Sequence, residues 1–121
     1  MTAIDRNILR EQLGEHADVE GTLRDLAPIF LAHTQACLVR LRDAAERFDH
    51  RAVGRLAHTL KGSAATLGAT DLSLCCAALC KAAQSQNAHD VTRSMERVTS
   101  SFTSVSSELA DHLASAGHSL P

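Results

Sequence analysis

The chain has 121 residues, the usual length of one domain, of which 45% are hydrophobic and only 2% aromatic. A core of Leu, Ala and Val favours packed helices, while the net charge of −2 and the scarcity of rings that stack on bases argue against a nucleic-acid-binding protein. No apolar run has the length of a membrane span and no signal peptide opens the chain, so we expect one cytoplasmic domain over residues 1–121 without direct membrane contact.

Two helices are predicted in the first part of the chain. Apolar residues at helical spacing indicate a short helix over residues 4–13, with Asp5 as its N-cap. The polar residues 14–21 are expected to form a connection. A longer apolar stripe follows over residues 23–48, and Pro28 interrupts it near its start. Either this helix is kinked at Pro28, or its regular part begins there with proline in the first turn.

A third amphipathic helix is predicted over residues 50–67, with Asp49 as its N-cap and Gly68 in a left-handed C-cap. Its apolar residues fall on one face, and its charged and small residues fall on the opposite face. The inner face consists of Val53, Leu56, Ala57, Leu60, Ala64 and Leu67, and the outer face of Arg51, Arg55, His58, Lys61 or Gly62, and Ala65. This separation places His58 outside the core.

Two further helices complete the predicted fold. The fourth begins near residue 70 and is followed by a polar turn at residues 85–87; its inward residues are Leu72, Cys75, Cys76, Leu79 and Ala83. The fifth is capped by His89 or Asp90 and ended by Gly117, with residues 118–121 as a loose tail. Short connections favour antiparallel neighbours. We therefore expect an all-α fold, an antiparallel up-down four-helix bundle with a short N-terminal helix.

The four cysteines lie in apolar helical stretches and form no CxxC pair. We interpret Cys37, Cys75, Cys76 and Cys80 as free thiols that behave as small hydrophobic residues in a reducing compartment. Metal or thiol chemistry at Cys75, Cys76 and Cys80 is an alternative, but no second pair of ligands is visible. We expect no metal site.

The candidate site is the pair His58 and Lys61. In a helix these residues are one turn apart, about 4.5 Å along the axis, so both side chains lean toward one patch of solvent. Gly62 removes side-chain bulk beside them, although glycine within a helix costs roughly 1 kcal/mol relative to alanine. A helix that accepts this cost beside a histidine and a cation indicates a site that something approaches closely.

The segment AHTLKGSAATLGA, residues 57–69, resembles the signature of histidine-containing phosphotransfer (HPt) domains, and the resemblance extends over most of the chain. It implies a four-helix bundle in which His58 accepts a phosphoryl group from a receiver-domain aspartate and passes it to another receiver. Family members often carry Glu or Gln on the next helix at the position of Cys80. Cysteine is a poor substitute for that Glu or Gln. The next residue, Lys81, points about 100° away from Cys80 around the helix.

The chemistry of these residues agrees with that role. Neutral imidazole is a competent nucleophile near pH 7, and Lys61 can give the phosphoryl group a charge-assisted hydrogen bond. Arg51 and Arg55 make the patch basic, which suits an acidic partner pocket, and Gly62 leaves room for the partner's loops. These three residues and Ala65 are the expected docking residues. No intrinsic cofactor is expected, because the partner should bring Mg²⁺.

The expected partners are therefore the receiver domains of a hybrid kinase and of a response regulator, with no nucleic acid, and the domain should be a monomer. It is either free-standing or the C-terminal domain of a larger, membrane-bound hybrid sensor kinase. No ATP-binding segment is visible, so we expect a phosphotransfer intermediate and not an enzyme. One alternative is the phosphoacceptor domain of a chemotaxis-type kinase, which has a similar His-x-x-Lys-Gly pattern. Another is a docking bundle that binds a receiver without transferring phosphate.

Overall fold

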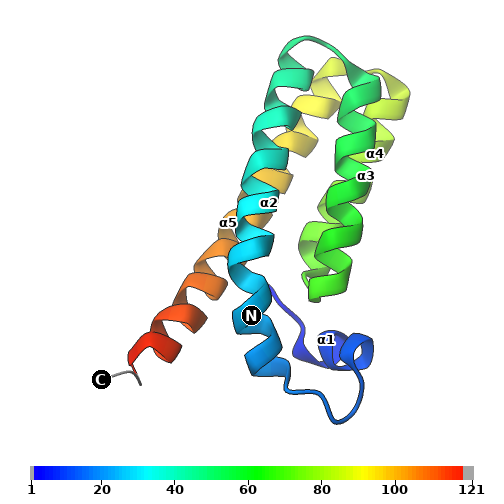
Figure 1. Ribbon diagram of the computed structural model, residues 1–121. Helices are drawn as coiled ribbons and strands as arrows, with labels where there is room; N and C mark the ends of the chain where they lie inside the picture. The colour runs from blue at the N-terminus through cyan, green and yellow to red at the C-terminus, as the bar shows by residue number, and fades with distance from the viewer. Residues whose placement is uncertain (1, 119–121) are drawn as a thin grey trace.

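A computed structural model describes the backbone of residues 2–118 and the side chains of residues 2–114, and this part of the chain is all-helical. It contains five helices and no strand, which confirms the prediction that the fold is all-α. The helices are α1 (Arg6–Leu13), α2 (Val19–Glu46), α3 (His50–Leu67), α4 (Thr70–Ser85) and α5 (Ala88–His118) (Figure 1).

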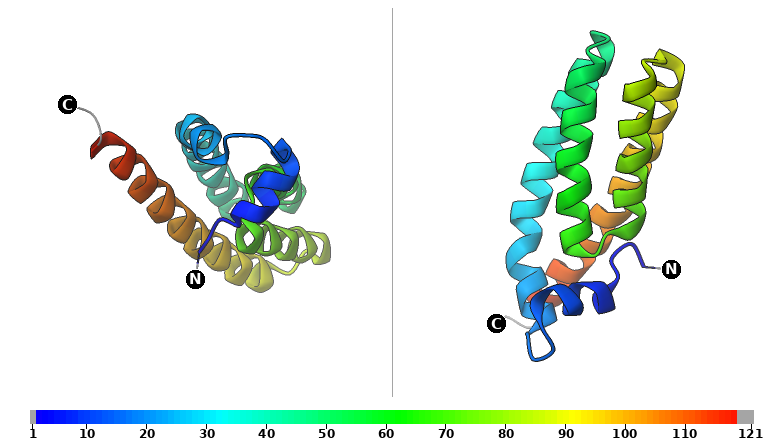
Figure 2. Two further views of the ribbon diagram at one scale, coloured as in Figure 1. Left: turned by 90° about the horizontal axis from the view of Figure 1, so that it is seen from below. Right: turned by 90° about the vertical axis from the view of Figure 1, so that its right-hand side faces the viewer.

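The four longer helices pack around a shared core. α2, α3 and α4 lie side by side, and α5 runs diagonally behind them (Figures 1 and 2). The most extensive contact is between α3 and α4, and α5 packs on α4 and α2. α1 lies across one end of these helices and contacts α2 and α3. The helix that carries His58 is therefore held by neighbours on both sides.

Aspartate side chains cap the first three helices. Asp5 Oδ1 accepts hydrogen bonds from the backbone N–H groups of Asn7 and Ile8, and Asp49 Oδ1 accepts one from Ala52 at 3.1 Å. Both caps were predicted, and each is worth about 1 kcal/mol. A third cap, Asp18, begins α2 at Val19. The predicted connection over residues 14–21 was therefore too long at its end.

Pro28 lies inside α2, nine residues after the helix begins. Of the two alternatives for this helix, the one in which its regular part begins at Pro28 is therefore wrong. The apolar face continues on both sides of the proline, because Val19, Leu23, Ala27 and Phe30 are all buried. Burying these side chains outweighs the hydrogen bond that proline cannot donate.

The ends of α5 also differ from the prediction. Asn87 caps this helix: its Oδ1 accepts a hydrogen bond from the Asp90 backbone N–H at 3.1 Å, so neither His89 nor Asp90 is the cap. The helix continues through Gly117 to His118, so Gly117 does not end it. The rest of the predicted tail, residues 119–121, lies outside the described residues.

The turn between α3 and α4 is tied to the N-terminal segment. Gly68 ends α3 in the left-handed conformation, with φ of 82°, as predicted. The Asp5 backbone N–H donates to the Gly68 carbonyl oxygen at 2.8 Å, and a Cβ at Gly68 would lie 2.6 Å from the Asp5 carbonyl oxygen. Glycine is required here both by its conformation and by this close approach. The C-terminal end of α3 is therefore fixed.

Candidate functional site

The outer face of α3 lies in solvent, as its periodicity predicts. Its six predicted members, which are Arg51, Arg55, His58, Lys61, Gly62 and Ala65, are all exposed. On the opposite face, Val53, Ala57, Leu60 and Ala64 are fully buried. This buried face fixes the rotation of the helix about its axis, because turning α3 would expose those side chains. His58 is therefore presented to solvent by a rigid element.

His58 opens onto a hollow between α3 and α4, which we call the His58 hollow. Its volume is about 940 Å³, and its lining consists of His50, Arg51, Gly54, Arg55, His58 and Thr59 of α3, Cys80, Ala83 and Gln84 of α4, and Gln86. The structure thus brings together three predicted residues, His58 and the two arginines. The other three, Lys61, Gly62 and Ala65, are not among the lining residues. The site therefore has two parts. Arg51 and Arg55 form a basic part that faces α4, and Lys61, Gly62 and Ala65 form a second part farther along α3.

Two hydrogen bonds set the register of α4 against α3. Ser73 Oγ donates to the Lys61 carbonyl oxygen at 3.2 Å, and Cys80 Sγ donates to the Gly54 carbonyl oxygen at 3.6 Å. The helices run antiparallel, because higher numbers on α4 face lower numbers on α3. A Cβ at Gly54 would lie 3.7 Å from Ala83 Cβ, so the helices approach closely here. Cys80 consequently lies against the turn of α3 that precedes His58.

Lys61 acts electrostatically on Cys80. Burial raises the pKa of the Cys80 thiol, and the positive charge of Lys61 partly opposes this rise. The charge of Lys61 on α3 therefore acts on the Cys80 thiol of α4. None of the ion pairs within the described residues involves Lys61, so this charge is available to an anion. Lys81, in contrast, lines a separate hollow between α4 and α5 with Arg93 and Arg97.

Gly62 is not required by packing within the chain. A Cβ built at this position meets no other atom within 4 Å. The helix nevertheless carries the residue that costs it roughly 1 kcal/mol of stability. Together with the exposed Ala65 on the next turn, Gly62 leaves a low, open strip beside His58.

Sequence reasoning missed an apolar groove on the α2 side of this strip. The groove has a volume of about 280 Å³ and is lined by Leu26, Ile29, Phe30 and His33 of α2 and by Ser63, Thr66 and Leu67 of α3. We call it the Ile29 groove, because the Ile29 side chain in it is 67% exposed. Ser63 follows Gly62 directly and Thr66 follows Ala65, so the groove adjoins the low strip. The only signal in the sequence was an isoleucine outside the buried stripe of its helix.

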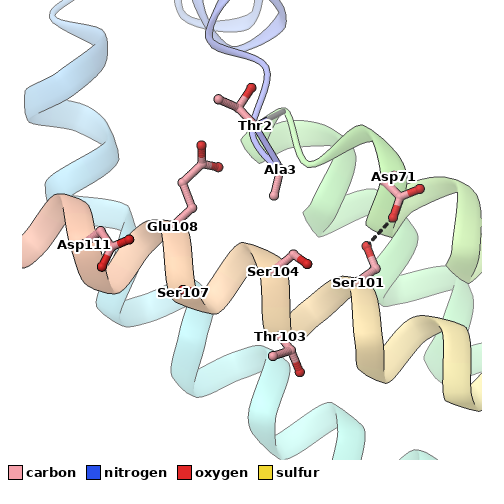
Figure 3. Close-up of a pocket in the computed structure, with 9 residues that line it drawn as sticks. All are labelled: Thr2, Ala3, Asp71, Ser101, Thr103, Ser104, Ser107, Glu108 and Asp111. Carbon is pink, nitrogen blue, oxygen red and sulfur yellow. Dashed lines mark hydrogen bonds between the residues drawn. The ribbon is translucent and has the colours of Figure 1, made fainter.

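Another hollow, of about 770 Å³, lies between the N-terminal segment and α5 (Figure 3). Two of its three carboxylates already have partners within the chain: Asp71 accepts a hydrogen bond from Ser101 at 2.7 Å, and Glu108 accepts one from the Ile4 backbone N–H at 2.8 Å. Arg6 also pairs with Glu108 at 3.6 Å. These interactions join α1, α4 and α5, so we interpret this hollow as structural. It contains none of the predicted site residues.

The surroundings of the four cysteines bear on the alternative of metal or thiol chemistry. Among the described residues, no three His, Cys, Asp or Glu side chains are grouped so that they can hold a metal ion. Cys37 and Cys76 are buried, and burial raises the pKa of the Cys76 thiol to about 12. Thiols with raised pKa values stay protonated near pH 7 and are poor nucleophiles. These findings favour the histidine site over thiol chemistry.

A comparison with protein-family models identifies the family of the chain. A family model described as "Hpt domain" matches residues 25–119, which is more than half of the chain and includes all of α3 and α4. A comparison with curated proteins and with solved structures gave no match. In the part of the chain that the structure describes, no helix has the length and apolar character of a membrane span.

Proposed function

Because the chain belongs to the Hpt domain family, we propose that it is a phosphocarrier of a two-component phosphorelay. In this proposal His58 accepts a phosphoryl group from an aspartate of one receiver domain and passes it to another. The observation that carries the proposal is the position of His58: it lies in the matched segment, on the exposed face of a helix whose rotation is fixed, with Lys61 one turn away. The chain is an intermediate in transfer and not a catalyst.

The transfer step requires little from the carrier. The lone pair of neutral His58 Nε2, the ring nitrogen farther from the backbone, attacks the phosphorus atom of the receiver's aspartyl phosphate. The N–P bond forms as the P–O bond to the aspartate breaks, and the electron pair of that bond returns to the carboxylate. The proton on Nδ1 stays in place, so the ring becomes a phosphorylated imidazolium. The reverse step delivers the phosphoryl group to the next receiver.

Lys61 supplies the positive charge that the carrier contributes. Its charge also acts on Cys80 of α4, where it opposes the rise in the pKa of that thiol that burial produces. A phosphoryl group on Nε2 carries up to about two negative charges, and a hydrogen bond from an ammonium group is worth roughly 1.5–3 kcal/mol. We assign Mg²⁺ and the remaining stabilisation of the transition state to the receiver.

The receiver is proposed to dock over the low strip of Gly62 and Ala65 and to reach the Ile29 groove. Open space at Gly62 allows the partner's loops to approach His58 closely. The exposed Ile29 offers an apolar contact beside the strip, and Arg51 and Arg55 offer charges that attract an acidic partner. We propose that the carrier acts as a cytoplasmic monomer built as an antiparallel up-down four-helix bundle.

Labelling tests this proposal and separates it from its alternatives. A phosphorylated receiver domain should give an acid-labile, base-stable phosphate on the chain, mapped to His58 and lost in His58→Gln. A chemotaxis-type phosphoacceptor would take label from ATP through a kinase domain but never from a phosphorylated receiver. A docking bundle would bind the receiver equally well with or without His58 and would take no label.

A further inference from the structure

The Cys80 thiol is poorly suited to bind a phosphoryl group on His58. It is half-buried, and its Sγ donates toward the Gly54 carbonyl oxygen at 3.6 Å, so its only proton is directed at the backbone of α3. A thiol is also a weak hydrogen-bond donor. The α4 side of the site therefore needs another donor if the phosphoryl oxygens are to be bound there.

Gln84 is in the right place to supply that donor. It follows Cys80 by four residues and so lies on the same face of α4, one turn farther along. Its side chain is exposed and lines the His58 hollow together with His58. Side chains on a helix lean toward the N-terminus of that helix, so Gln84 leans back over Cys80.

The side chain of His58 leans in the converging direction. On α3 it is carried toward Gly54 and Arg55, and Gly54 is the residue that Cys80 contacts across the helix pair. The close approach of Gly54 to Ala83 keeps this part of α4 near α3. His58 and Gln84 therefore line one hollow from opposite helices, and Cys80 lines the same hollow.

We propose that the side-chain amide of Gln84 donates a hydrogen bond to the phosphoryl group on His58 and takes the part that Cys80 cannot play. The inference rests on the proposed function and identifies a further residue of that site. The amide carries two N–H donors, and the phosphoryl oxygens are strong acceptors. Lys61 binds the phosphoryl group as a charge, and Gln84 binds it as a neutral donor. Gln86 also lines the hollow, but it ends α4 in the left-handed conformation and lies off the Gln84 face.

The test is the equilibrium of phosphoryl exchange with a receiver domain, measured as the ratio of phosphorylated carrier to phosphorylated receiver. A residue that only helps docking changes the forward and reverse rates together and leaves this equilibrium constant unchanged. A residue that binds the phosphoryl group in the free carrier shifts the constant. We expect Gln84→Ala to lower it about tenfold, a typical loss for a hydrogen bond to a charged group.

Two matched variants make the test more specific. Gln84→Glu keeps the shape of the side chain but replaces the donor with a negative charge, so it should lower the constant further, whereas Gln86→Ala should leave it unchanged. An unchanged constant in Gln84→Ala, or an equal loss in Gln86→Ala, would overturn the proposal even if transfer rates fell. Labelling with phosphoramidate, a small phosphodonor, separates failure of the Gln84 proposal from failure of the proposed function. A carrier whose His58 takes no label from a phosphorylated receiver or from phosphoramidate would contradict both proposals.

Discussion

The charge of Lys61 on α3 acts on Cys80 of α4, because it opposes the rise in the pKa of that thiol that burial produces. Lys61 lies one turn from His58 on the exposed face of α3 before any phosphoryl group arrives. A charge that is already near its position costs less ordering when the phosphoryl group binds.

Replacing Lys61 with alanine should slow transfer from a receiver by about 10- to 100-fold, because a charge-assisted hydrogen bond of roughly 1.5–3 kcal/mol is lost. The melting temperature should hardly change, since the side chain is exposed. The pKa of Cys80 should rise further without the lysine charge, which is measured as slower alkylation of that cysteine, followed by peptide mapping at several pH values. A large loss of stability, or an unchanged alkylation profile, would show that Lys61 is placed wrongly.

Substitutions of Gly62 should separate folding from docking. Gly62→Ala should raise the free energy of unfolding by up to about 1 kcal/mol, because alanine favours the helix and its Cβ meets open space. Gly62→Leu should also fold, yet it should slow phosphorylation by a receiver much more than labelling by phosphoramidate. Thermal melts and paired labelling rates check this. Equal effects on both donors would argue against a role in clearance for the partner.

The Ile29 groove makes a separate prediction about docking. Ile29→Asp should weaken receiver binding and slow transfer about tenfold or more, because a charge replaces an apolar contact at the interface. The matched control is Val39→Asp on the same helix, since Val39 is 65% exposed and Ile29 is 67% exposed. Val39 lies outside the groove, so its variant should transfer normally. If both variants transfer at the same rate, the receiver does not use this groove.

Burial of Cys76 should make the stability of the fold depend on pH in the alkaline range. The pKa of this thiol is about 12 in the folded chain, against 9.0 for the unperturbed group, so the folded state holds the proton to higher pH. Its contribution is present below about pH 9 and is lost as pH rises toward 12, by up to about 1.4 kcal/mol per pH unit. Denaturant unfolding between pH 8 and about pH 11 measures the slope. Cys76→Ala should flatten it, and an identical slope in that variant would contradict the assignment.

The sequence predicted α3 well, because its start and its end both have local signals. Asp49 and Gly68 are a standard cap pair, and an uninterrupted apolar face between them fixes which residues point outward. The first half of α2, in contrast, contains local signals that argue against a helix. Pro28 and a glycine lie in its first half, and local propensity reads them as breaks. Burial of Val19 and Leu23 against other helices decides the outcome, and that information is not local.

The same difference applies to the site. His58, Lys61 and Gly62 lie within five residues on one helix, so their spacing alone places them together. Gln84 and Ile29 come from other helices and join the site only through the pairing of those helices with α3. The register that brings Gln84 to the His58 hollow depends on close packing at Gly54 and Ala83, which no periodicity in the sequence reveals.

Incubation of the purified chain with a phosphorylated receiver domain tests the central claim most directly, with several receivers tried in parallel. The account predicts an acid-labile, base-stable phosphate that maps to His58, and its complete absence in His58→Gln, which should fold normally because His58 is exposed. Phosphate that survives in His58→Gln, or no label from any receiver in a chain that binds one, would contradict it.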